Sequence, residues 1–135
     1  MSIRSYRDLK IWQVGIELAV HAYKLTERLP KAEQYGLTSQ MRRAATSIPA
    51  NIAEGYQRHY DTELRHFLYM AYGSLAELET FAHLCERLGY LNGDVLEPLL
   101  SQSAEIGRML NGFIRKIRSP ESWRPSASAA QKAGG

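Results

Sequence analysis

Apolar residues recur every three or four positions along most of the chain, the spacing that places side chains on one face of an α-helix. The pattern predicts four helices, over about residues 6–29, 37–54, 62–88 and 95–117, joined by short polar or glycine-containing connections. No segment shows the two-residue alternation of a β-strand. We therefore predict an all-α fold, an antiparallel up-down-up-down four-helix bundle that occupies residues 1–118.

Capping and breaking residues set the predicted ends of these helices. Ser5 and Asp8 have the spacing of a capping box, which predicts the start of the first helix. Pro30 ends that helix, and Gly55 is expected to close the second helix in the left-handed conformation. Pro49 lies inside the second helix, where the loss of one backbone hydrogen bond predicts a bend.

The first and third predicted helices each carry two apolar rows, although a surface helix of a monomer needs one stripe a little over about 100° wide. In the first helix, Trp12 and Ile16 belong to one row, and Val14 and Leu18 belong to the other. The second row of the third helix contains Phe67, Met70, Phe81, Leu84 and Leu88. Two interpretations fit this pattern: the helices lie deep in the core of a monomer, or the extra row contacts another subunit of a homo-oligomer.

A polar row lies beside the apolar face of the second helix. Its members, spaced by three or four residues, are Gln40, Arg43, Ser47, Asn51, Glu54 and Arg58. With Gly55, all of these except Arg58 are interpreted as a structural seam at which helices or subunits meet. Within this seam, Arg43 is expected to be held by a carboxylate from another helix or subunit, and the alternative is that Arg43 binds a ligand. Arg42 points about 100° away from Arg43 and therefore away from the apolar face.

The composition is that of one ordinary soluble domain. The chain has 135 residues, of which 44% are hydrophobic and 23% are charged. No apolar run approaches the roughly 20 residues of a membrane span, and the first residues lack an apolar signal-peptide core. The single cysteine, Cys85, fits a reducing compartment, so we expect a cytoplasmic protein without membrane contact. Residues 119–135, rich in Ser, Ala, Pro and Gly, are predicted to be a disordered tail in which Trp123 packs locally.

The sequence offers little for catalysis or metal binding. Glu63 and His66 have the Glu-x-x-His spacing of di-iron bundles. Such a site needs two of these pairs and two further carboxylates, and only one pair is present. Cys85 lies on the predicted core face with no histidine placed to activate it, and there is no glycine-rich phosphate loop. We predict no metal, no cofactor and no enzymatic activity.

The net charge of +3 and the pI of about 9.1 are mildly basic, and neither value alone establishes nucleic-acid binding. Symmetric self-association would repeat each basic patch within one assembly. The residues predicted to contact a phosphate backbone are Arg42, Arg58, Arg115, Lys116 and Arg118. The alternative for these residues is ordinary solvated charge.

Two segments of the sequence resemble a known protein family. Residues 33–45, EQYGLTSQMRRAA, and residues 47–55, SIPANIAEG, are similar to the four-helix-bundle proteins encoded in intervening sequences of bacterial 23S ribosomal RNA. Arg42 and Arg43 match the arginine pair of that family, and the resemblance extends over residues 9–91. It implies a cytosolic homo-oligomer, typically a pentamer around a central channel, with a basic surface suited to nucleic acid. In a related branch, the accessory variability determinant of diversity-generating retroelements, it also implies a reverse-transcriptase partner.

These observations favour a non-enzymatic, oligomeric accessory protein that binds the backbone of RNA or DNA through rings of Arg and Lys. No groove-reading motif is present, so little readout of base sequence is expected. The alternative is an oligomeric scaffold that binds a protein partner and no nucleic acid. A bundle enzyme or a metal protein is the third hypothesis.

Overall fold

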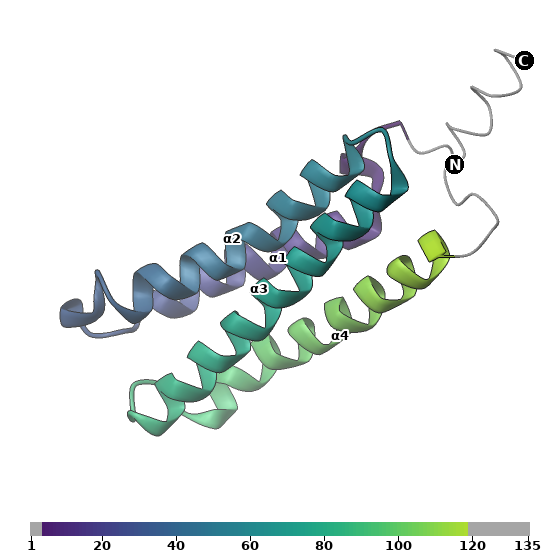
Figure 1. The fold of residues 1–135 in the computed structure, drawn as a ribbon. Coiled ribbons are helices and arrows are strands. Elements are labelled where there is room, and N and C mark those ends of the chain that lie inside the picture. The colour runs from purple at the N-terminus through teal and green to yellow at the C-terminus, as the bar shows by residue number, and fades with distance from the viewer. Residues whose placement is uncertain (1–3, 119–135) are drawn as a thin grey trace, which may run out of the picture.

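The computed structural model describes residues 4–118, which form four α-helices and two short 3-10 helices. The α-helices are α1 (Lys10–Thr26), α2 (Leu37–Tyr56), α3 (Asp61–Arg87) and α4 (Gly93–Arg118), and the 3-10 helices are η1 (Tyr6–Asp8) and η2 (Lys31–Glu33). The four long helices run side by side and reverse direction at each connection (Figure 1). No strand occurs among the described residues, so the predicted all-α class is confirmed, whereas the predicted tail with Trp123 lies outside them.

Each long helix packs against two neighbours around a shared core. Helix α2 contacts α1 and α3, and α4 contacts the same two helices. The core is filled by fully buried apolar side chains from all four helices: Leu18, Met41, Ile48, Ile52, Leu64, Leu68, Leu78, Leu96, Leu99, Ile106 and Leu110. None of the helices described is long and apolar enough to cross a membrane.

The first predicted helix is divided into two parts. Ser5 Oγ accepts a hydrogen bond from the Arg7 N–H at 3.1 Å, and the Asp8 carboxylate accepts one from the Ser5 N–H at 3.3 Å. This capping box therefore starts the 3-10 helix η1 and not the α-helix. Leu9 then has an extended backbone, with φ −73° and ψ 125°, which separates η1 from α1.

Gly55 lies inside α2, one residue before its end, and its role differs from the predicted one. Gly89, with φ 77°, is the one described glycine with a positive φ, so the prediction that Gly55 closes the helix in the left-handed conformation is wrong. A Cβ at Gly55 would lie 2.8 Å from the Phe67 Cβ and 3.1 Å from the Leu64 Cδ1 of α3. Position 55 therefore needs glycine because α2 and α3 approach closely there.

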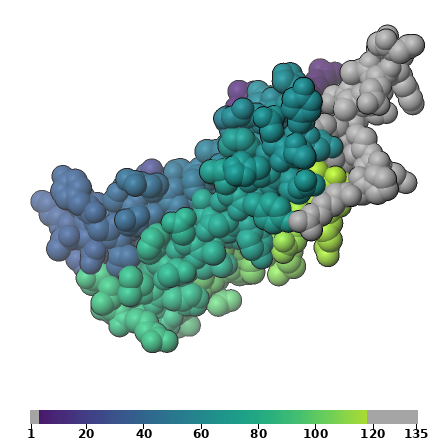
Figure 2. Space-filling view, viewed as in Figure 1, coloured from purple at the N-terminus to yellow at the C-terminus, as the bar shows by residue number. Residues whose placement is uncertain are grey.

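The bundle covers only part of the apolar surface of α1 and α3. In α1, Ile16 and Val20 are 38% and 48% exposed. In α3, Met70, Leu84 and Leu88 are 45%, 44% and 51% exposed. Helix α3 runs along the surface of the molecule in the space-filling view (Figure 2). Parts of the apolar surface of both helices therefore face outward from this chain, whereas Leu18 in the second row of α1 is fully buried. Contact of the exposed parts with another subunit stays a prediction.

Candidate nucleic-acid interface

Basic residues gather at one end of the bundle. We call the basic end the part formed by residues 4–10, 54–66 and 108–118, which the antiparallel order of the helices brings together (Figure 1). The opposite end comprises residues 24–43 and 77–97. The basic end has nine Lys or Arg against four Asp or Glu, a net charge of +5, and the opposite end has six against seven, a net charge of −1. The modest overall charge of +3 thus conceals a marked asymmetry.

The last turns of α4 carry the greatest density of positive charge. Residues 108–118 contain four basic residues and no acidic residue. Arg115 and Lys116 are exposed there, and Arg118 is the last residue of the helix. Adjacent residues of a helix point about 100° apart, so Arg115 and Lys116 present their charges on two sides of α4. Three of the five predicted phosphate contacts therefore lie on one short segment.

Two basic residues outside the predicted set lie at the same end. Lys10 is the first residue of α1, is exposed, and lines a cavity together with the last turns of α4. Arg7 is exposed on η1, with its guanidinium carbon 4.7 Å from the centre of the Tyr6 ring. The predicted topology could have identified both residues. In an up-down four-helix bundle, the start of the first helix and the end of the last helix lie at the same end.

Arg42 is half-buried at the opposite end and contacts α1. Its Nε donates a hydrogen bond to Thr26 Oγ1 at 2.9 Å, and its Nη2 donates one to the Tyr23 carbonyl at 3.4 Å. The guanidinium carbon also lies 4.5 Å from the centre of the Tyr23 ring. The prediction that Arg42 points away from the packed face is wrong, because this side chain satisfies polar groups at the C-terminal end of α1. Its geometry is that of a structural residue.

Arg58 follows α2 at the basic end, where its side chain contacts Glu54 and Phe67. Its Nη2 lies 2.8 Å from Glu54 Oε1, and its guanidinium carbon lies 4.9 Å from the centre of the Phe67 ring. Both charged side chains are exposed, and an ion pair of that kind contributes only about 0–1 kcal/mol to stability. The charge of Arg58 therefore remains at the surface, in a weak ion pair with Glu54.

The remaining residues of the predicted polar seam show two kinds of environment. Ser47 Oγ donates to the Ala44 carbonyl at 2.9 Å, and Asn51 Nδ2 donates to the Ser47 carbonyl at 2.7 Å, so both bond within α2. Gln40 and Arg43 are exposed. The side chain of Arg43 forms no hydrogen bond or ion pair with any of residues 4–118, so the carboxylate predicted to hold it is not one from this part of the chain. A carboxylate from another subunit stays a prediction.

The opposite end is closed by a polar contact between two connections. The Glu33 carboxylate accepts a hydrogen bond from the Leu37 N–H at 3.1 Å and another from the Tyr90 hydroxyl at 2.8 Å. These two hydrogen bonds lower the pKa of Glu33, and the bond to Glu33 raises the pKa of Tyr90. Glu33 thus joins the segment before α2 to the turn between α3 and α4.

Comparison with known proteins places the chain in a family. The family model described as 23S rRNA-intervening sequence protein matches residues 7–112. The chain belongs to this family. A solved structure of a protein of unknown function from the S23 ribosomal protein family of Bacteroides thetaiotaomicron is similar, with 27% sequence identity and a TM-score of 0.72. The similarity covers 77% of this chain and 97% of that chain. A comparison with curated proteins finds no match.

The range matched by the 23S rRNA-intervening sequence protein family bears on the candidate interface. It includes Arg7, Lys10 and Arg58, but it ends at Gly112, before Arg115, Lys116 and Arg118. The positive charge at the end of α4 therefore lies beyond the part of the chain that the family model matches. The family description assigns no enzymatic activity, and the function of the solved relative is unknown.

The described part of this family member is predicted to lack a metal site and a reactive thiol, and its side chains bear on both points. Among residues 4–118, no group of three or more His, Cys, Asp or Glu residues is placed to hold a metal ion. Cys85 is buried, with its Sγ 3.6 Å from Met41 Sδ, and desolvation raises the pKa of its thiol. A thiol with a raised pKa is a poor nucleophile because its thiolate form is disfavoured.

Proposed function

We propose that this protein is a non-enzymatic, oligomeric accessory protein that binds the phosphate backbone of RNA or DNA through the basic end. The observation that carries the proposal is the charge asymmetry, a net +5 at the basic end against −1 at the opposite end. Phosphate contacts supply most of the affinity of non-specific nucleic-acid binding and need only Lys and Arg at suitable spacing. The names of the family and of its solved relative refer to ribosomal RNA and ribosomal proteins, which favours RNA as the first probe.

The proposed contact residues differ from the predicted set in one important respect. Arg42 is left out because its guanidinium is bonded to Thr26 and to the Tyr23 carbonyl. Arg58, Arg115, Lys116 and Arg118 are retained, and Arg7 and Lys10 are added. These six residues come from three separate segments of the chain that meet at the basic end, a distribution suited to a backbone that passes across the end of the bundle.

The salt dependence of RNA binding tests this proposal. The purified full chain is titrated into a fluorescent structured RNA, and binding is followed by anisotropy at increasing salt. Because binding to phosphates releases counterions, affinity should fall by about 10³-fold or more between about 50 mM and 200 mM salt if six phosphates are contacted. Absence of binding to both structured RNA and duplex DNA at low salt would contradict the proposal.

Self-association is the second part of the proposed function. The exposed apolar rows of α1 and α3 each place two exposed side chains one turn apart, Ile16 with Val20 and Leu84 with Leu88. Exposed apolar groups that gather on a surface mark protein interfaces. We infer a homo-oligomer in which these rows are covered by other copies, and the family resemblance favours a pentamer. Such an assembly would repeat the basic end around its symmetry axis and raise the local density of positive charge.

Light scattering tests the self-association. The mass in solution should be several times the 15.3 kDa of one chain. Val20→Glu combined with Leu84→Glu should release folded monomers, because each substitution places a charge in an exposed apolar row. The matched control is Ala104→Glu, at an exposed position of α4 outside both rows, which should leave the mass unchanged. A monomeric parent protein would contradict this part of the proposal.

The exposed apolar rows also favour a second candidate function, a scaffold that binds a protein partner such as a reverse transcriptase. In that case the rows would be covered by the partner, and the basic end would not need nucleic acid. The salt titration separates the two functions, since a scaffold without nucleic-acid affinity shows no binding at low salt.

A further inference from the structure

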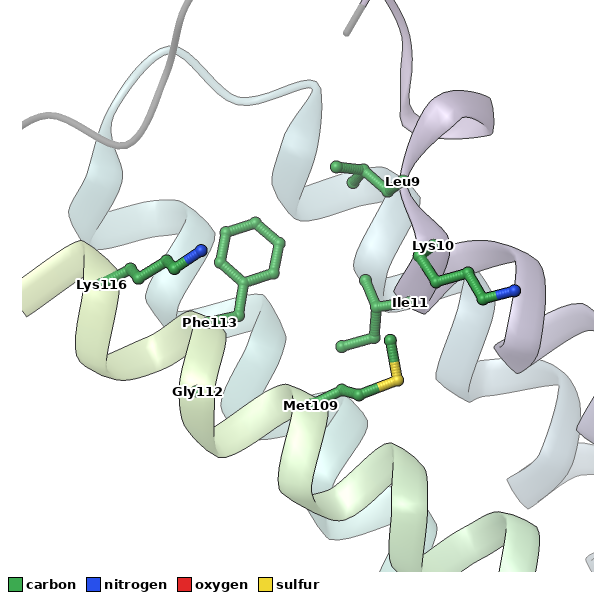
Figure 3. A pocket seen from close by; sticks show the side chains of 7 residues that line it. All are labelled: Leu9, Lys10, Ile11, Met109, Gly112, Phe113 and Lys116. Carbon is green, nitrogen blue, oxygen red and sulfur yellow. The ribbon is translucent and has the colours of Figure 1, made fainter. Parts of the chain in front are cut away.

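A cavity opens at the basic end between the start of α1 and the last turns of α4 (Figure 3). It has a volume of about 390 Å³. Its apolar lining comes from Leu9, Ile11, Met109 and Phe113, and its basic lining comes from Lys10 and Lys116. Small-ligand sites span about 300–1,000 Å³, so this cavity is at the low end of that range and suits one ring system.

A glycine of α4 and the break before α1 both border the cavity. Gly112 lies on the wall formed by α4, and a Cβ at this position would meet no other atom within 4 Å. On the other wall, the extended backbone of Leu9 turns the chain from η1 into α1. A larger side chain at position 112 therefore has open space to occupy on this wall of the cavity.

The charged side chains that line the cavity, Lys10 and Lys116, are both positive. No carboxylate from residues 4–118 lines it. The nearest acidic residue along the chain, Asp8, accepts hydrogen bonds from the Arg4 N–H at 2.9 Å and from the Ser5 N–H at 3.3 Å. Figure 3 shows the amine of Lys116 beside the Phe113 ring, while the amine of Lys10 extends away from it. The cavity thus suits a flat apolar group with anionic groups on either side.

We propose that the cavity receives one unpaired base of a single-stranded nucleic acid, whose neighbouring phosphates contact Lys10 and Lys116. This inference rests on the proposed function and adds a preference for single-stranded segments. Bases pack on apolar and aromatic side chains largely without regard to sequence, which agrees with the absence of a groove-reading motif. In a duplex, each base is paired and stacked, and it must be extruded at a cost before it can enter the cavity.

The test compares two single strands that carry the same phosphate charge. Oligothymidylate and an abasic DNA strand of the same length are each titrated with the full-length protein at one salt concentration. The parent protein should bind oligothymidylate about tenfold more tightly, the effect of one packed base. Gly112→Leu should abolish this difference by filling the cavity, and should leave the affinity for the abasic strand unchanged.

The control variant is Ser101→Leu, which adds the same side chain at an exposed position of α4 away from the cavity. It should keep the tenfold preference, and circular dichroism should show that both variants are folded. Equal binding of the two strands by the parent protein, or a preference that survives in Gly112→Leu, would overturn the cavity proposal and leave backbone binding in place. Failure to bind either strand would overturn the cavity proposal alone, because the proposed function is decided by the titration of structured RNA and duplex DNA.

Discussion

The two ends of the bundle use their charged residues in different ways. At the opposite end, Arg42 and Glu33 are bonded to groups on neighbouring segments of the chain. At the basic end, Lys10, Arg115 and Lys116 are exposed and form no ion pair with any of residues 4–118. Arg42 and Glu33 therefore contribute to the fold, whereas the charges of Lys10, Arg115 and Lys116 stay exposed at the surface. A count of Lys and Arg along the sequence does not separate these uses.

The helices are also held together differently at the two ends. Near the basic end, α2 and α3 approach so closely at Gly55 that a Cβ would lie 2.8 Å from the Phe67 Cβ. At the opposite end, polar side chains such as Arg42 and Glu33 connect the elements. The comparison predicts steric sensitivity at one end and sensitivity to the loss of polar contacts at the other.

The largest expected effect is steric. Gly55→Leu should lower the free energy of unfolding by about 3 kcal/mol, because the added side chain must displace Phe67 and Leu64 of α3. Gly73→Ala is the control, since no atom lies within 4 Å of a Cβ there, and it should raise stability by about 0.5–1 kcal/mol. Urea denaturation measures both values. If Gly55→Leu and the parent protein had the same free energy of unfolding, α2 and α3 would be able to move apart at this position without loss of stability.

The next largest effect separates two adjacent arginines. Arg42→Met should lower stability by about 1–2 kcal/mol, because it removes the hydrogen bonds to Thr26 and to the Tyr23 carbonyl. Arg43→Met removes the same charge from an exposed side chain and should change stability by no more than about 0.5 kcal/mol. Thermal unfolding compares the two variants. If Arg42→Met weakened RNA binding as much as Lys116→Met does, the structural assignment of Arg42 would be contradicted.

The smallest effect is a pH dependence at the opposite end. Because the folded-state pKa of Glu33 is lowered, its contribution to stability is present above its unfolded-state pKa of about 4.3 and is lost as the pH falls through the lowered value. Tyr90→Phe removes one of the two hydrogen bonds that lower this pKa. The variant should therefore melt at a lower temperature near neutral pH, and the difference from the parent protein should shrink in acid.

The matched control for this titration is Tyr35→Phe, because Tyr35 is 90% exposed. It should melt like the parent protein at every pH. A difference between Tyr90→Phe and the parent protein that stays constant as the pH falls would show that the hydroxyl acts independently of the charge on Glu33.

The fold could be predicted from the sequence because burial of one apolar face decides where each helix lies. Leu64 and Leu68, on the predicted core face of the third helix, are fully buried. Periodicity could not place Arg42 correctly, because α2 packs against both α1 and α3. Its buried face is therefore wider than the single apolar stripe that the sequence shows. A helical projection shows that Arg42 and Arg43 differ in direction, but it does not show which direction the neighbouring helix occupies.

The candidate interface was only partly predictable for a related reason. Arg115, Lys116 and Arg118 are close in sequence and could be recognised as a group. Arg7 and Lys10 are about one hundred residues away and join them only through the antiparallel packing of α1 against α4. The cavity is bordered by Gly112 of α4 and by Leu9 at the break before α1, and neither feature produces a periodic pattern.

The most direct test of charge use at the two ends is a pair of charge reversals. Arg115→Glu with Lys116→Glu changes the basic end, and Arg28→Glu with Lys31→Glu makes the same change in net charge at the opposite end. The first pair should weaken binding of structured RNA by at least about tenfold and reduce the slope of log affinity against log salt by about 2, while the second pair should have little effect. Equal weakening by both pairs would contradict the assignment of RNA binding to the basic end.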